Sequence, residues 1–158
     1  MTEVTVSPDR GETDRNLALL GYCLLLGSIL FAGLPGLAAV VLAYVQRDVA
    51  APAIRSHFNF QIRIFWVALA LTVIAALSAL GALAVGVGQI VDVGMDRQWD
   101  AWDGVSFDGS DIRIDPAIVV LLGVAAGAVV AATLWTILAP IVGLIRLASQ
   151  RGMGERAA

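Results

Sequence analysis

The chain contains no lysine, one cysteine, one histidine and few charged residues of any kind. All ten basic residues are arginine, and charged residues make up 15% of the 158, against about 25% in ordinary soluble domains. One cysteine cannot form an intramolecular disulfide and is too few for a cysteine-based zinc site. The net charge of -3 leaves no broad basic face, so nucleic acid is not an expected partner.

Apolar residues are abundant instead. They make up 59% of the chain before its 16 glycines are counted, and the mean hydropathy is +0.85. Ordinary soluble domains hold about 45–50% apolar residues with glycine included. A soluble fold of this size cannot bury so much apolar surface, so the composition excludes a soluble enzyme domain and a disordered chain. It predicts a membrane protein with the lipid bilayer as its first partner.

Charged residues are absent from three runs, 16–46, 64–91 and 116–145, each 28 to 31 residues long. A helix of about 28 residues is about 42 Å long, which exceeds the ~30 Å hydrocarbon core. Each run can therefore cross a bilayer once, and none is long enough to cross twice as a helical hairpin. The sequence predicts an all-α membrane protein with three transmembrane helices.

We expect one membrane domain over 16–149, between a disordered polar tail and a short C-terminal tail. Pro35 and Pro140 each remove a backbone donor inside a run, so kinks are expected near both. The expected parts are the tail 1–15, spans at about 17–45, 64–91 and 117–145, an acidic outer loop at 92–116, and the tail 150–158.

Arginine counts predict the orientation of these spans. Short arginine-rich segments stay in the cytoplasm, and the segments 46–63 and 146–158 each hold three arginines. With three crossings this places six arginines inside and four outside. The C-terminus is then expected in the cytoplasm, and the N-terminus and the seven-aspartate loop outside.

The segment 53–66 is expected to be an amphipathic helix that enters the membrane from its cytoplasmic face. Arg55, Asn59 and Arg63 recur every four residues and form one polar stripe. This stripe is either a solvated face on anionic lipid or a contact for a partner, and Trp66 belongs to the aromatic belt. His57 and Gln61 are also candidates for a contact at the cytoplasmic interface. They lie within or beside the apolar arc of this helix.

Residues 56–66 read SHFNFQIRIFW. This string resembles a signature of a family of small bacterial inner-membrane proteins of unknown function. Ile64 replaces a threonine of the family pattern. The third run is also similar, with Trp135 ahead of Gly143 and Leu144. The family is distantly similar to the multispan subunit of the chloroplast inner-envelope import machinery. The resemblance implies a three- or four-helix protein of the bacterial inner membrane.

Enzyme chemistry is not expected, and no cofactor or metal is predicted. The three runs contain no Asp, Glu or His, so they offer no intramembrane catalytic pair and no proton relay. Cys23 and His57 are expected about a membrane thickness apart, too far for a nucleophile and its base. Calcium on Asp103, Asp108 and Asp111 is one alternative to simple solvation of the loop.

Small residues in the third run favour helix association. Gly123 and Gly127 form a GxxxG pair, which lets helix backbones approach closely. The sequence leaves open whether this pair packs against another helix of the same chain or against a second copy. We expect a non-enzymatic integral membrane protein that acts as a homo-oligomer or as a small subunit of a membrane complex. The alternative is a pore or translocation component, with Gly33, Pro35 and Gly36 facing a shared lumen.

Overall fold

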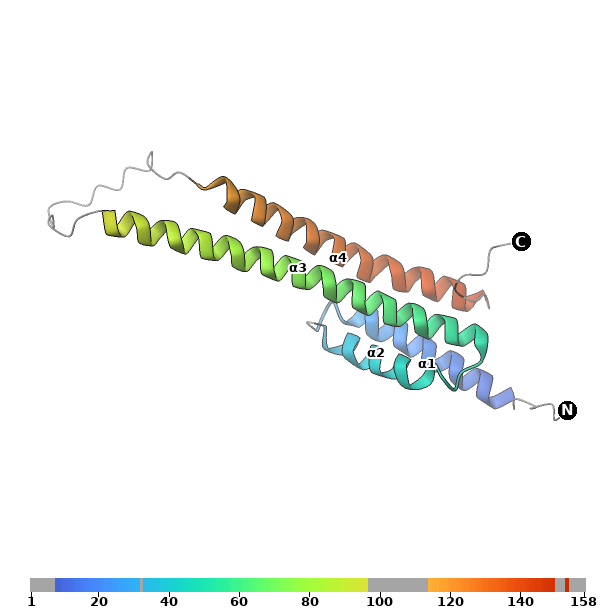
Figure 1. Cartoon of the computed structure of the whole chain (residues 1–158). Helices are drawn as coiled ribbons and strands as arrows, with labels where there is room; N and C mark the ends of the chain where they lie inside the picture. Colours follow the sequence, from blue (N-terminus) through green and yellow to red (C-terminus); the bar gives the residue numbers. More distant parts are fainter. Residues whose placement is uncertain (1–7, 32, 97–113, 150–152, 154–158) are drawn as a thin grey trace. The chain divides into compact units, whose positions relative to one another are not determined.

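The computed structural model describes residues 8–31, 33–96, 114–149 and 153, and within these ranges the chain is helical and contains no strand. This confirms the predicted all-α class. The described residues form four helices, which are in chain order α1 (Pro8–Gly27), α2 (Leu34–Gln46), α3 (Pro52–Asp96) and α4 (Pro116–Ala148) (Figure 1).

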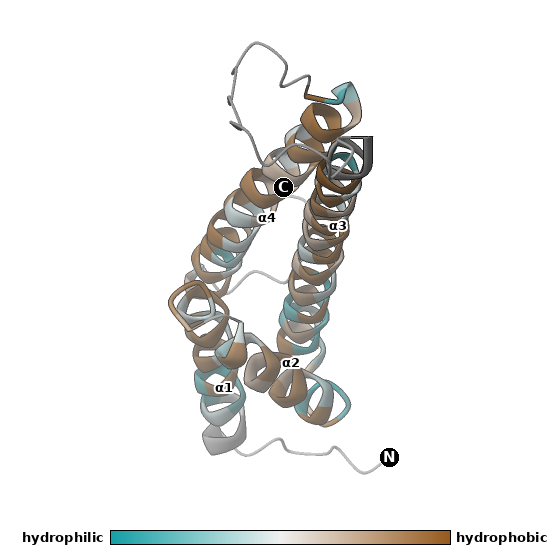
Figure 2. Cartoon of the chain, turned by 90° about the vertical axis from the view of Figure 1, so that its left-hand side faces the viewer, coloured by the Kyte–Doolittle hydropathy of each residue, from teal (hydrophilic) through white to brown (hydrophobic). Residues whose placement is uncertain are grey.

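Two of these helices, α3 and α4, are long and apolar enough to cross a membrane. The predicted spans 64–91 and 117–145 lie inside them. Only 11% of the most apolar stretch of each helix is buried, whereas the core helix of a soluble protein is mostly buried. Hydrophobic residues cover much of the visible length of both helices in Figure 2. The surface of these helices suits lipid better than water.

The first apolar run is predicted to be a single kinked span over 17–45, but the structure shows two helices there. α1 ends at Gly27, residues 28–31 and 33 form turns, and α2 begins at Leu34. Gly33 has φ 84°, a left-handed conformation that costs glycine little. Pro35 lies in the first turn of α2, where a missing N–H breaks no helical bond. The expected kink at Pro35 is therefore a break between two helices, and three membrane-spanning helices are not confirmed.

α1 and α2 pack against each other as an antiparallel hairpin (Figure 1). Gly36 allows close approach near the turn, since a β-carbon at this position would lie 3.3 Å from Ser28 Cβ. α1 begins at Pro8, inside the tail 1–15 that was expected to be disordered. Proline at the first helical position favours this helix start.

α3 and α4 begin and continue largely as their sequences predict. The expected entry helix 53–66 is helical and runs without interruption into the apolar part of α3. Asp115 caps α4, because its Oδ1 accepts the N–H of Ala117 at 2.8 Å, and Pro116 follows at the first helical position. α4 continues through Pro140, which is fully buried.

The chain forms two compact units, Met1–Ala70 with Ala131–Ala158, and Leu71–Val130. The first unit holds a core built from α1, α2, the start of α3 and the end of α4. In the second unit α3 packs on α4, where a β-carbon at Gly81 would lie 3.4 Å from Leu121 Cδ1. The buried members of the first core are Ala18, Tyr22, Leu25, Ala39, Ala43, Phe58, Ile64, Ala139 and Leu147.

Candidate functional site

The first four turns of α3 present two faces of different chemistry. One face is buried and carries His57 and Gln61, whose exposed fractions are 2% and 0%. The other is exposed and carries the predicted polar stripe, Arg55, Asn59 and Arg63, together with Trp66. The predicted site residues therefore divide into an inner pair and an outer set, and the structure does not bring all six together.

His57 pairs with Tyr22 of α1 inside the core. The Tyr22 hydroxyl and His57 Nδ1 lie 3.1 Å apart, and the two rings meet edge to face with centroids 6.1 Å apart. Tyr22 also lies against α4, where a β-carbon at Gly143 would overlap its ring. One aromatic side chain thus joins α1, α3 and α4. His57 is therefore a buried, hydrogen-bonded packing residue.

Gln61 forms a second polar contact between α3 and α1. Its Nε2 donates to the Ala18 carbonyl at 2.8 Å. Gly21 gives the side chain room, because a β-carbon there would lie 2.9 Å from Gln61 Cδ. Gln61 Oε1 is buried and has no hydrogen-bond partner among the described residues. An unpaired buried carbonyl costs free energy, so the contact of Gln61 with α1 satisfies only one end of its amide.

Sequence reasoning did not identify Tyr22, Gly21 or Gly143 as partners of this cluster. A signal for Tyr22 exists, since a tyrosine in an apolar run needs a hydrogen-bond partner for its hydroxyl. No sequence rule pairs it with His57, which is 35 residues away.

The exposed face continues onto α2 through aromatic and arginine side chains. Trp66 Nε1 donates to the Tyr44 hydroxyl at 3.1 Å, and the Arg47 guanidinium carbon lies 4.9 Å from the centre of the Tyr44 ring. Asp48 lies 3.6 Å from both Arg47 and Arg55. These ion pairs are exposed, so each contributes little to stability.

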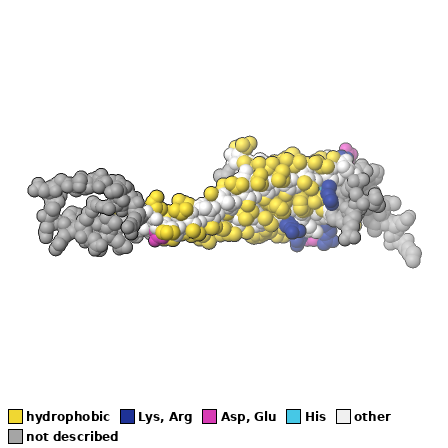
Figure 3. Space-filling model, turned by 90° about the horizontal axis from the view of Figure 1, so that it is seen from above, with side chains coloured by type: hydrophobic (Ala, Val, Ile, Leu, Met, Phe, Trp, Pro, Cys, Tyr) yellow, Lys and Arg dark blue, Asp and Glu magenta, His cyan; other side chains and the backbone are white. Residues whose placement is uncertain are grey.

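The arginine side chains of the view in Figure 3 gather in one region, and hydrophobic side chains cover most of the remaining described surface. Tryptophan, tyrosine and arginine on one face are typical of the boundary between lipid and water. The exposed face of α2 and α3 therefore carries residue types suited to contact with lipid headgroups.

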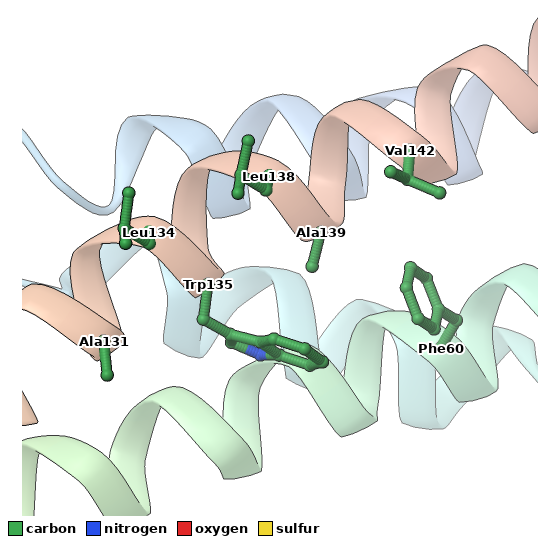
Figure 4. A pocket seen from close by; sticks show the side chains of 7 residues that line it. All are labelled: Phe60, Ala131, Leu134, Trp135, Leu138, Ala139 and Val142. Carbon is green, nitrogen blue, oxygen red and sulfur yellow. The ribbon is translucent and has the colours of Figure 1, made fainter.

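An open apolar groove lies between α3 and α4 in the first unit (Figure 4). Its volume is about 390 Å³. Trp135 forms its floor and donates from Nε1 to the Ile64 carbonyl at 3.2 Å, which attaches the ring to α3. The groove offers contact area for an apolar chain and no reactive group. Its lining consists of Phe60, Ala131, Leu134, Trp135, Leu138, Ala139 and Val142.

Gly123 and Gly127 lie on an exposed part of α4 in the second unit. A β-carbon at either position would meet no described atom within 4 Å. Packing of α4 on α3 within this unit uses other glycines, with Gly81 against Leu121 and Gly86 near Ile118. The GxxxG pair therefore makes no close contact with the described part of the chain.

The described residues contain no group of three side chains that could hold a metal ion. The aspartates Asp103, Asp108 and Asp111 lie outside the described residues. The expected separation of Cys23 from His57 is wrong, because Tyr22, which precedes Cys23, bonds to His57. The folded-back first run causes this difference. Cys23 itself is exposed, whereas His57 is buried.

No protein-family model, curated protein or solved structure matches this chain. The resemblance of residues 56–66 to a family signature stays a prediction, and the geometry above carries the functional argument.

Proposed function

We propose that this chain is a non-enzymatic, multi-pass protein of the bacterial inner membrane that acts through helix association. It does so as a homo-oligomer or as a small subunit of a membrane complex. Its partners are the bilayer and another helix, and it needs no cofactor. The C-terminus and the segment between α2 and α3 lie in the cytoplasm in this proposal.

The observation that carries the proposal is the open glycine pair on α4. Association of helices in lipid depends on close packing, because lipid tails are as apolar as the side chains they contact. Gly123 and Gly127 allow such close packing, and no described part of the chain uses them. A helix of another molecule is therefore the partner that best suits this surface.

A paired substitution tests the association. We expect Gly123→Leu with Gly127→Leu to weaken co-purification of two differently tagged copies, or of a partner, by about tenfold or more, because bulky side chains separate the backbones. The measurement is quantitative mass spectrometry of native-nanodisc preparations.

The matched control is Gly88→Leu on α3. Gly88 is also exposed, and a β-carbon there would meet no described atom within 4 Å. It should leave co-purification unchanged. Equal loss in both variants, or no loss in either, would contradict the assignment of the interface to the glycine pair.

A pore or translocation component is the alternative. A lumen would need polar groups turned toward it, but Ser28 and Thr136 donate their hydroxyls to backbone carbonyls of their own segments. No contact among the described residues favours this alternative over association. Single cysteines along α3 would detect a lumen by reacting with a water-soluble thiol reagent at helical spacing.

A further inference from the structure

The two helices of the N-terminal hairpin are short in comparison with a bilayer. α2 has 13 residues, so it is about 20 Å long, against a hydrocarbon core of about 30 Å. The charge-free part of α1, residues 16–27, is about 18 Å long at the same rise per residue. Neither leg can cross the core by itself.

The turn between the legs is apolar, and five backbone N–H groups in it or next to it are hydrogen-bonded within the chain. Its exposed residues include Leu30, which is 80% exposed, and Phe31. The N–H groups of Ser28, Ile29, Leu30, Gly33 and Leu34 all donate to carbonyls within the turn or the end of α1. Lipid tolerates a reversal of the backbone only when such polar groups are paired. This turn therefore fits hydrocarbon rather than water.

The hairpin also lies beside the start of the apolar run of α3. A β-carbon at Gly36, close to the turn, would lie 3.8 Å from Phe65 Cδ2. The charge-free run begins at Ile64 and continues to Val91. From Phe65 this run extends for about 39 Å at 1.5 Å per residue. The turn thus lies near the end of α3 that enters the membrane.

Arginine counts favour a hairpin that enters and leaves on one side. If the N-terminus lies on the same side as 47–63 and the C-terminal tail, eight arginines lie there and only two, Arg97 and Arg113, lie opposite. With three crossings, six arginines would lie on the cytoplasmic side and four on the other side. The positive-inside rule is satisfied better by the first arrangement.

We propose that the α1–α2 hairpin is a re-entrant surface that inserts its apolar turn among the acyl chains of the cytoplasmic leaflet and returns to the cytoplasm. The chain then crosses the membrane twice, through α3 and α4, and both termini are cytoplasmic. This inference rests on the proposed membrane location and replaces the expected outer N-terminus.

Single-cysteine labelling in the Cys23→Ser background tests this topology. The reporters are Gly11→Cys on α1, Ala51→Cys between α2 and α3, Ser149→Cys after α4, and Ser110→Cys in the acidic loop. Gly11, Ala51 and Ser149 are exposed, and a β-carbon at Gly11 meets no described atom within 4 Å. A membrane-impermeant maleimide is applied to intact cells and to inverted vesicles.

We expect Gly11→Cys, Ala51→Cys and Ser149→Cys to react only in inverted vesicles, and Ser110→Cys to react only in intact cells. Reaction of Gly11→Cys together with Ser110→Cys would overturn the re-entrant hairpin and leave the membrane proposal standing. Reaction of all four from one side, or recovery of the chain in the alkaline carbonate supernatant, would overturn both.

Discussion

The Tyr22 ring fills the space that the missing side chain of Gly143 leaves on α4, and its hydroxyl meets His57 on α3. Three helices depend on this one contact, so its geometry allows little change. Gly21 has the same relation to Gln61. Individual glycines therefore determine how closely α1 approaches its neighbours, although neither of these two lies in a turn.

A methyl group at Gly143 should destabilise the fold. We expect Gly143→Ala to lower the free energy of unfolding in detergent by about 1–3 kcal/mol, because the new atom overlaps a buried ring and forces the helices apart. Thermal unfolding of the purified protein measures this change.

Gly88→Ala on α3 is the control, because Gly88 is helical, exposed and outside the proposed association surface. Its new methyl group meets no described atom within 4 Å, and alanine is the better helix former, so stability should be equal or slightly higher. Equal destabilisation by both substitutions would show that helix propensity, rather than contact with Tyr22, controls the effect.

Among the helical elements, the α1–α2 hairpin differs most from the structure that its sequence predicts, which is a single membrane-spanning helix. A charge-free run of 31 residues matches one tilted crossing in length and composition. The decisive signal was the pair Gly33 and Pro35, which suits a helix start as well as a kink. Only the left-handed conformation of Gly33 and the packing of α2 on α1 distinguish the two outcomes.

Replacing Gly33 should weaken the reversal. We expect Gly33→Ala to lower the free energy of unfolding by about 1–2 kcal/mol, because a β-carbon is strained at φ 84°. Gly27→Ala is the control, since Gly27 is helical and a β-carbon there meets no described atom within 4 Å.

Chemical unfolding in detergent compares the two variants. A loss of stability in Gly27→Ala as large as in Gly33→Ala would mean that the hairpin does not depend on the left-handed residue.

α3 shows how much of an element its sequence can predict. The four-residue spacing of Arg55, Asn59 and Arg63 correctly predicted one exposed polar stripe, and the continuation of the helix into the apolar run is confirmed. The spacing of His57 and Gln61 placed them near the apolar side but could not identify their partners. Those partners belong to α1, so they depend on tertiary packing.

For the whole molecule, the main question is whether water or lipid surrounds α3 and α4. Their large hydrophobic side chains are mostly exposed, which water would penalise and lipid does not. A charge introduced at the centre of such a helix should therefore act through the bilayer, with no contact inside the protein.

We expect Leu77→Arg to reduce membrane insertion at an apparent cost of about 2.5–3.5 kcal/mol, the usual cost for arginine at the centre of a spanning helix. Leu77 is exposed and lies in the middle of the run 64–91. The inserted fraction after alkaline carbonate extraction measures the effect.

Ala51→Arg, before the start of α3, is the control and should insert normally. If Leu77→Arg inserts as well as this control, the middle of α3 does not contact lipid, and the membrane proposal fails with it.

The sequence by itself determined the helical class, the two long apolar helices and the polar stripe on α3, because composition and periodicity are local properties of the chain. The tertiary structure alone decided three other features. The first run folds back between Gly27 and Leu34, Tyr22 meets His57, and Gly123 with Gly127 contacts no other described helix closely. The physical reason is that each of these depends on which helix backbones can approach one another, and such approach depends on residues distant in the sequence.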